Sequence, residues 1–218
     1  MAHVAGPTAA LAGVPAGLQA QGVWSGRRQI FVRFAAEAET ATMYTADALA
    51  NELRRSTSRS AYHSISISGR DPLSNVDYLC AAFAKPPVDL PVMLDTDGQR
   101  PEAIPALKKF VGLTQVTLEG NMLEATTERG MQTIRAAAES GMQHALVLCS
   151  SEQTSDAQLL RIVEQARGVS GATQIVIHPP PGVPVDRDRR WMTLLERAAA
   201  LHNDVRFALK LPPPTGMR

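Results

Sequence analysis

Cysteine is scarce in this chain. Two cysteines, Cys80 and Cys149, occur among 218 residues, too few and too far apart for a disulfide framework or a metal-cluster motif. An excess of one charge is also missing, because the formal net charge is +1. This balance gives no electrostatic basis for binding nucleic acid or an anionic membrane. We therefore expect reduced thiols in a cytoplasmic protein with neither of these partners.

Long uninterrupted apolar runs are absent as well. Residues 1–17 are rich in alanine, glycine and proline, but Pro7, Gly13 and Pro15 interrupt them and no basic segment precedes them. This argues against a signal peptide, and no stretch is long enough to span a bilayer. We predict a flexible leader over residues 1–17 and one domain over residues 18–218, which is long enough to bury a substantial core.

Short β-rich runs alternate with helical patterns along the chain. The predicted strands are 29–34, 63–68, 90–95, 113–118, 144–149, 173–178 and 205–209. The predicted helices are 45–56, 75–84, 128–140, 156–167 and 187–202. Most of these strands are too apolar for a sheet with one face in water. The alternation predicts an α/β fold with a mostly parallel sheet, either a partial barrel or an open sheet, with ligands at the carboxyl edge of the strands.

Five segments have the order and spacing of the motifs of one enzyme family. They are 18–22 (LQAQG), 22–36 (ending in FVRFAA), 67–73 (ISGRDPL), 94–98 (LDTDG) and 204–218 (DVRF to GMR). Together they resemble the radical SAM enzymes that make 7-carboxy-7-deazaguanine. The resemblance implies a radical-SAM-type partial (βα)6 barrel, similar to a TIM barrel. In that family the protein tends to be a homodimer and uses a 4Fe–4S cluster, S-adenosylmethionine (SAM) and Mg²⁺ to contract a pterin ring.

The resemblance also implies a substrate pocket, of which remnants are Leu18, Gln19, Ala20 and Arg33. The family's LQAQG-like segment holds the pterin, and its strand arginine contacts it. The terminal segment departs from the family at Lys210, so one edge of this pocket is altered. A small purine-like or pterin-like ligand is one expected partner, and a second protein chain, identical or different, is another.

The family's cofactor ligands are replaced. Glu37, Ala41 and Tyr44 stand where the family has the three cysteines of its CxxxCxxC motif, and Ala46 stands where it has a magnesium-binding threonine. A 4Fe–4S cluster needs cysteine thiolates, which these side chains cannot supply. We therefore expect no cluster, no SAM and no Mg²⁺.

The second strand ends differently from the family's GGEP motif. It reads Gly69, Arg70, Asp71, and the long cationic side chain of Arg70 stands where a glycine lets the backbone approach SAM. We expect Arg70 to obstruct the cofactor space and to repel the positive charges of SAM.

Acidic residues follow the next two strands. Asp95 and Asp97 lie in the LDTDG segment, and Glu119 follows the fourth strand in place of the family's SAM contacts. Two interpretations remain open. Either Arg33 and Arg70 pair with these acids and fill the emptied space, or the three acids hold a hard metal ion in a repurposed site.

His178 ends the sixth predicted strand, directly before a proline-rich run. With Lys210 it is a candidate for the edge of the pocket. A single histidine at a strand exit is either a hydrogen-bonding group that orients the loop or a catalytic base. No nucleophile elbow, phosphate-binding loop or HExxH metal motif accompanies it.

These observations predict a catalytically degenerate homologue of the deazaguanine synthases, without cluster or SAM chemistry, that acts as a binding, scaffold or regulatory subunit. Two alternatives remain open. The first is an enzyme or small-molecule binder with a repurposed pocket. The second is an active SAM-dependent synthase whose cluster ligands come from elsewhere.

Overall fold

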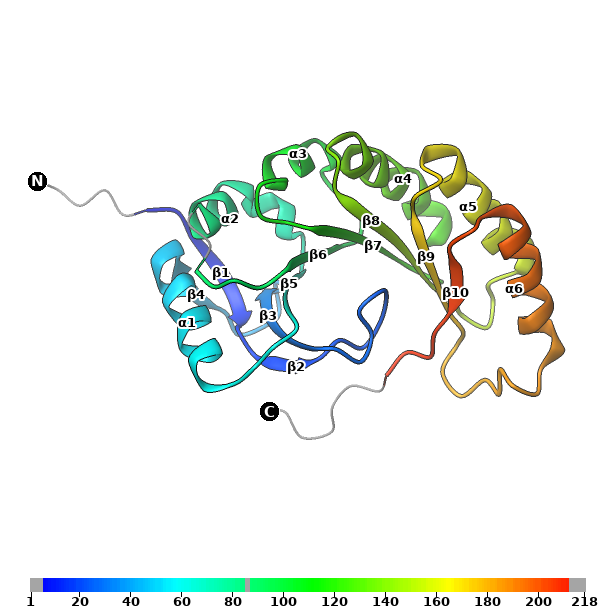
Figure 1. The fold of residues 1–218 in the computed structure, drawn as a ribbon, viewed down its shortest axis with the longest axis horizontal. Helices are drawn as coiled ribbons and strands as arrows, with labels where there is room; N and C mark the ends of the chain where they lie inside the picture. The colour runs from blue at the N-terminus through cyan, green and yellow to red at the C-terminus, as the bar shows by residue number, and fades with distance from the viewer. Residues whose placement is uncertain (1–5, 85–86, 212–218) are drawn as a thin grey trace, which may run out of the picture.

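The computed structural model describes residues 6–84 and 87–211 and has a mixed α/β fold around one sheet (Figure 1). The strands of the described residues are β1 Thr8–Gly13, β2 Ala16–Leu18, β3 Arg28–Phe34, β4 Thr42–Thr45, β5 Ser64–Gly69, β6 Val92–Thr96, β7 Leu113–Glu119, β8 Gln143–Cys149, β9 Gln174–His178 and β10 Val205–Phe207. Their order is β10-β9-β8-β7-β6-β5-β3-β1-β4, with β2 paired to β3. In the part of this order that runs from β10 to β3, every strand pairs with its neighbour in parallel. The sheet does not close on itself.

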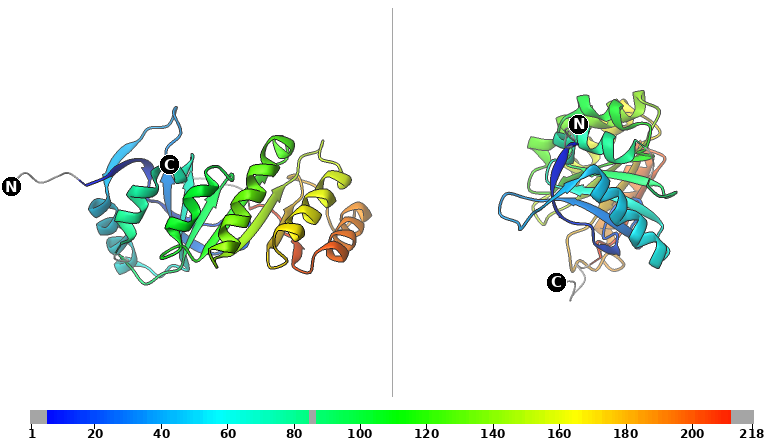
Figure 2. Two further views of the ribbon diagram at one scale, coloured as in Figure 1. Left: turned by 90° about the horizontal axis from the view of Figure 1, so that it is seen from above. Right: turned by 90° about the vertical axis from the view of Figure 1, so that its left-hand side faces the viewer.

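Helices connect the parallel strands and lie on one side of the sheet (Figures 1 and 2). They are α1 Ala46–Arg59, α2 Val76–Phe83, α3 Ile104–Leu107, α4 Leu123–Glu139, α5 Asp156–Val169 and α6 Arg189–Leu201. Two short 3₁₀ helices, η1 Pro72–Asn75 and η2 Pro101–Ala103, precede α2 and α3. No helix among the described residues combines the length and the apolar character that crossing a membrane requires.

The hydrophobic core lies between the sheet and the helices. Alternate residues of the parallel strands point to this side and are fully buried there: Ile30 and Val32, Ile65 and Ile67, Leu94, Val116, Leu146 and Leu148, and Ile175 and Ile177. Each such side chain contributes about 1.5–3 kcal/mol by leaving water. Because strand side chains alternate, the residues between them point to the opposite side, called the inner face below.

The first residues described do not form the predicted flexible leader. Strand β1 pairs antiparallel with both β3 and β4, and its Ala9 and Leu11 side chains are buried. Strand β2 pairs with β3. The prediction of a flexible leader is therefore wrong from residue 8 onward, because pairing with distant strands orders a segment with little strand propensity of its own. Residues 1–5 lie outside the described residues.

Candidate functional site

A row of polar side chains crosses the inner face near the carboxyl ends of the strands. Directly paired residues in parallel strands point to the same side. The strand register therefore places Asp95 of β6 beside Gln115 of β7, Glu119 of β7 beside Cys149 of β8, and Cys149 beside His178 of β9. Parallel α/β sheets bind ligands at this edge. The inner face is thus the first candidate site.

The connection between β2 and β3, residues 19–27, lies over this row and is called the cover below (Figure 1). Val23 packs against inner-face side chains that precede the row along the strands, including Met93 and Val147. Its N–H donates to Gln115 Oε1 at 3.1 Å. Gly22 has a φ of +77°, and a Cβ there would lie 2.0 Å from Gln115 Oε1. Trp24 packs edge-on against His63, with 5.0 Å between ring centroids. The cover is therefore fitted closely to the sheet.

Asp95 is the acidic member of the row, and it is half-buried. Its Oδ1 accepts a hydrogen bond from the Thr117 hydroxyl at 2.7 Å, and Gln21 of the cover donates to the same hydroxyl at 3.5 Å. Burial raises the pKa of the Asp95 carboxyl, and the hydrogen bond from Thr117 opposes this rise. Asp95 is held by neutral groups rather than by a cation.

Cys149, at the end of β8, lies beside the charged side chains of Lys210 and Glu119. Lys210 Nζ is 4.0 Å from its Sγ and 3.6 Å from Glu119 Oε1, and Gln21 Oε1 lies 3.7 Å from the sulfur. Burial raises the pKa of the Cys149 thiol to about 12, and the Glu119 carboxylate adds to the rise. The thiol is therefore protonated at neutral pH and is a poor nucleophile or metal ligand.

His178 is buried at the end of β9 and holds the cover. Its Nε2 accepts the N–H of Gly22 at 2.9 Å, and its Nδ1 lies 2.6 Å from the carbonyl oxygen of Ala208. Of the two open interpretations, this geometry matches a loop-orienting group, because neither ring nitrogen is free to act as a base. Burial lowers the pKa of the imidazole.

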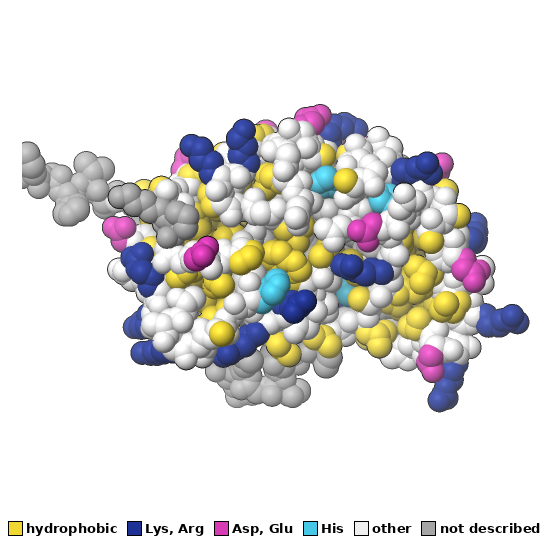
Figure 3. All heavy atoms as spheres, in the orientation of Figure 1, with side chains coloured by type: hydrophobic (Ala, Val, Ile, Leu, Met, Phe, Trp, Pro, Cys, Tyr) yellow, Lys and Arg dark blue, Asp and Glu magenta, His cyan; other side chains and the backbone are white. Residues whose placement is uncertain are grey.

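A second candidate site is a groove at the carboxyl ends of β3 and β5, with a volume of about 500 Å³. Three ion pairs surround it. Arg33 pairs with Glu39, Arg70 with Glu37 at 3.2 Å, and Arg100 with Asp71 at 2.9 Å. The positive and negative charges balance, and Figure 3 likewise shows opposite charges interspersed on the face it presents.

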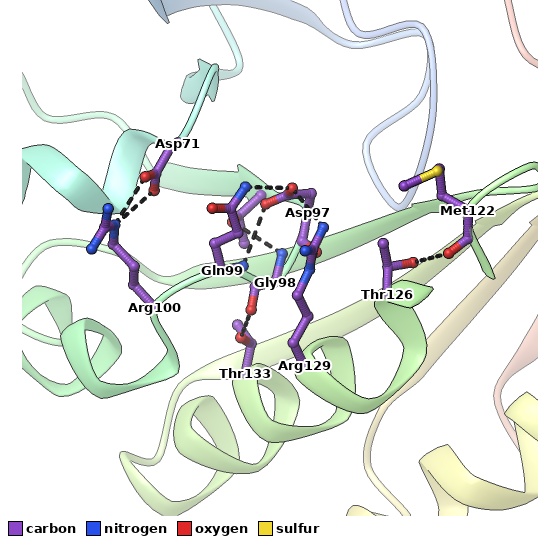
Figure 4. Close-up of polar contacts among 10 residues, drawn as sticks. Asp71, Asp97, Gly98, Gln99, Arg100, Met122, Thr126, Arg129 and Thr133 are labelled. Carbon is purple, nitrogen blue, oxygen red and sulfur yellow. Dashed lines mark hydrogen bonds and ion pairs between the residues drawn. The ribbon is translucent and has the colours of Figure 1, made fainter. Parts of the chain in front are cut away.

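The turns after β5 and β6 have matching conformations. Each contains a glycine with positive φ, a left-handed residue two positions later and then a proline that begins a 3₁₀ helix. The left-handed residues are Asp71 (φ 39°) and Arg100 (φ 54°), and they form an ion pair with each other (Figure 4). A Cβ on Gly69, the glycine of the first turn, would lie 2.2 Å from the carbonyl oxygen of Phe34. Both turns are therefore tightly constrained.

Asp97 supports the second turn rather than a ligand. Its carboxylate accepts from Arg129 of α4 at 3.0 Å and from the Gln99 side chain at 2.8 Å (Figure 4). The carbonyl oxygen of Gly98 accepts from the Thr133 hydroxyl at 2.7 Å. These contacts fasten the turn to α4.

The two interpretations of the acidic residues are both contradicted by these contacts. Asp95, Asp97 and Glu119 each have a different partner, and among the described residues no three His, Cys, Asp or Glu side chains are placed to hold a metal ion. Arg33 and Arg70 do not pair with these acids but with two glutamates of the loop after β3. The Arg70 side chain is 59% exposed, so it does not fill the cofactor space as predicted.

The predicted remnants of the substrate pocket are not brought together. Gln19 is buried and Ala20 belongs to the cover, whereas Leu18 is 55% exposed at the end of β2. Arg33 points toward the loop after β3, where it pairs with Glu39. The segment that resembles a substrate-holding motif thus covers the inner face itself.

The residues at the cluster positions do not fit an iron–sulfur cluster. Glu37 pairs with Arg70, Tyr44 belongs to β4, and Ala46 is the first residue of α1. Ala41 immediately precedes β4. The two thiols cannot substitute, because Cys80 packs on the helix side of the sheet and Cys149 lies on the inner face. The donor set lacks the thiolates that a cluster or its SAM ligation needs.

The sequence did not identify four residues that contribute side chains to the polar row of the inner face or contact it. They are Gln21, Gln115, Thr117 and Cys149. Period-two alternation would have placed Gln115, Thr117 and Glu119 on one side of β7. The position of Gln21 had no such signal, since it depends on how the cover folds.

Solved structures of radical SAM enzymes share this fold. SuiB from Streptococcus suis, in complex with its precursor peptide SuiA, has a TM-score of 0.60 and 14% identity, over 80% of this chain and 44% of SuiB. A radical SAM methyltransferase from Sphaerobacter thermophilus has a TM-score of 0.58 and 14% identity, over 84% of this chain and 66% of that enzyme. The chain therefore spans less than half the length of SuiB.

These likenesses define the class of fold: the chain has a radical SAM-type fold. No protein-family model matches the sequence, and no curated protein matches it either. At 14% identity the structural likeness supports the fold only. It does not assign the activity of SuiB or of the methyltransferase to this chain.

Proposed function

We propose that this protein is a non-catalytic binding or scaffold subunit built on a radical SAM-type fold, without a 4Fe–4S cluster or SAM chemistry. One observation carries the proposal. The segment that stands where the resembled family has its cluster loop continues into strand β4, in which Tyr44 pairs with Ala9 of β1. In place of a loop that could wrap a cluster, the chain has an edge strand without thiolates.

A more specific proposal, the family from which this chain descends, rests on where the family-like sequence segments lie in the fold. The segment 67–73 falls at the end of β5 and 94–98 at the end of β6, the strand ends at which the resembled synthases have their ISGGEPL and LETNG motifs. We therefore propose descent from 7-carboxy-7-deazaguanine synthases, with the sheet as a partial (βα)6 barrel. A homodimer or a complex with another protein is the corresponding proposal for its partners.

A second function is favoured by the polar row of the inner face. Asp95, Cys149 and His178 lie on one face at the strand edge where α/β proteins bind ligands. A small polar molecule bound there after displacement of the cover would make the protein a small-molecule binder or an enzyme with changed chemistry. Thermal-shift screening with pterins, purines and SAM tests this, because a ligand of the folded state raises the melting temperature.

Anaerobic reconstitution with iron and sulfide tests the main proposal. We expect no charge-transfer absorbance and no stoichiometric iron, while an active radical SAM enzyme treated in parallel gains both. The matched control is the double variant Cys80→Ser with Cys149→Ser, which should retain as little iron as the wild type. A brown protein with stoichiometric iron that the double variant loses would show that the chain does bind a cluster.

A further inference from the structure

His178 joins two segments that are far apart in the sequence. Nδ1 faces the Ala208 carbonyl, which only accepts hydrogen bonds, so Nδ1 carries the proton. Nε2 faces the Gly22 N–H, which only donates, so Nε2 is unprotonated. The imidazole is therefore neutral and bridges the cover and the segment after β10. Ser150 fixes the backbone of His178, since its N–H and its hydroxyl both donate to the His178 carbonyl oxygen, at 2.9 and 2.7 Å.

Other hydrogen bonds also hold the cover. The Leu211 N–H donates to the Ala20 carbonyl oxygen at 2.9 Å, and Arg206 of β10 donates to the Val23 carbonyl oxygen at 3.5 Å. The contacts with β7 described above, from Val23 to Gln115 and from Gln21 to Thr117, do not involve His178. Loss of the His178 bridge would therefore free Gly22 and the segment after β10 and leave the cover with fewer contacts.

Some buried polar atoms beneath and around the cover have no hydrogen-bond partner within the part of the chain that the structure describes. Four polar atoms in this region, on side chains no more than 4% exposed, lack hydrogen-bond partners among the described residues: Gln19 Nε2, Gln29 Oε1, Ser66 Oγ and Gln115 Nε2. Gln29 and Ser66 belong to the inner face, because they alternate with the core residues Ile30, Ile65 and Ile67. An unpaired buried polar group costs about 1–3 kcal/mol. Opening would let water or a polar ligand satisfy these atoms.

We infer that residues 19–27 form a displaceable cover over the inner face and that neutral His178 is its latch, which protonation releases. A protonated imidazole carries hydrogen on both nitrogens, so Nε2 can no longer accept the Gly22 N–H. The two donors then face each other, and the cover loses its contact with β9. The latch does not depend on the proposed absence of a cluster.

The charged and titratable groups around His178 come from five parts of the chain. Lys210 lies in the segment after β10, Arg206 on β10, Glu119 on β7, and Asp95 and the neutral thiol of Cys149 on β6 and β8. Burial is the main cause of the lowered pKa of His178; Lys210 lowers it further, whereas Glu119 and the Ala208 hydrogen bond raise it. Because the pKa is lowered from the ordinary 6.5, the latch is closed at neutral pH and opens only as the pH falls through this lowered pKa.

Amide hydrogen exchange of residues 20–27 tests the latch directly. Protection factors, corrected for the intrinsic effect of pH, should fall at least tenfold in the wild type between about pH 7.5 and a second pH below the midpoint of the His178 titration. His178→Ala should show low protection at both values. His178→Gln should keep its protection at both, because the amide is neutral throughout and can accept from Gly22 and donate to Ala208.

The amides of α5 serve as the internal control and should remain protected wherever the cover opens. The imidazole titration followed by NMR in the wild type gives a second measurement that needs no variant to fold. Its midpoint should coincide with the loss of protection in the cover. Protection that does not change with pH, or that changes equally in His178→Gln, would overturn the inference.

Discussion

Asp71 and Arg100 occupy equivalent left-handed positions in two matching turns, and the guanidinium Nε of Arg100 lies 2.9 Å from the carboxylate of Asp71. The left-handed conformation costs a non-glycine residue about 1–2 kcal/mol. We expect Arg100→Ala to lower the free energy of unfolding by about 1 kcal/mol, since it loses the pair and keeps the strain. Arg100→Gly should lose less, because glycine relieves the strain. Urea denaturation of both variants checks the order, and a larger loss for glycine would contradict it.

Asp95→Asn should raise stability at neutral pH. The folded-state pKa of Asp95 lies above the unfolded value of 3.8, so the wild type loses stability as pH rises through the interval between the two values. The asparagine variant avoids this loss, and its Oδ1 can still accept from Thr117. Denaturation curves of both proteins between about pH 3 and pH 8 should converge at the acidic end. A variant that is less stable at neutral pH would show that the carboxylate is required.

Tyr78→Phe is expected to stabilise the protein. Tyr78 is 2% exposed and packs edge-on against Phe34, but its hydroxyl has no partner among the described residues. Removing an unpaired buried hydroxyl should raise the free energy of unfolding by about 1 kcal/mol. Tyr62→Phe, at a half-buried position beneath Arg28, is the control and should change it by less than about 0.5 kcal/mol. A clear loss in Tyr78→Phe would indicate a bound water on the hydroxyl.

Both thiols should react slowly with iodoacetamide in the folded protein. Cys149, with a pKa of about 12, has a thiolate fraction of roughly one in 10⁴ near pH 8. Burial and the neighbouring Asp77 raise the pKa of Cys80 as well, but this side chain is half-buried and should react first. Mass spectrometry after timed labelling measures the order, and denaturant should make both react. Fast labelling of Cys149 in native protein would mean that the inner face opens readily.

The order of strands and helices could be predicted from local signals. The predicted strand 173–178 differs from β9 by one residue, because a run of β-branched residues marks a buried strand. Strand β1, with the sequence TAALAG, gives no such signal and is a strand only because its backbone pairs with β3 and β4. Pairing partners distant in sequence cannot be read from a single segment.

For the candidate site, the sequence could predict only which residues lie at the carboxyl ends of the strands. Asp95, Glu119 and His178 were correctly placed at the carboxyl edge, since that follows from the strand pattern. The partners of these groups and of Arg33 and Arg70 could not be predicted. Arg70 reaches Glu37 and Asp97 reaches Arg129 because of the conformation of the loops and the position of α4. These depend on packing that has no local signature.

Strand β4 also limits what cysteine substitutions alone could achieve. Glu37→Cys, Ala41→Cys and Tyr44→Cys together would supply three thiols in CxxxCxxC spacing but not a free loop to carry them. The third cysteine would stand in a strand whose backbone pairs with β1 from Thr42 to Thr45. Releasing it would expose an edge of β1 and the buried Ala9 and Leu11 side chains. Three point mutations would therefore cost stability before they could bind iron, because the backbone pairing of β4, and not only its side chains, keeps this segment from wrapping a cluster.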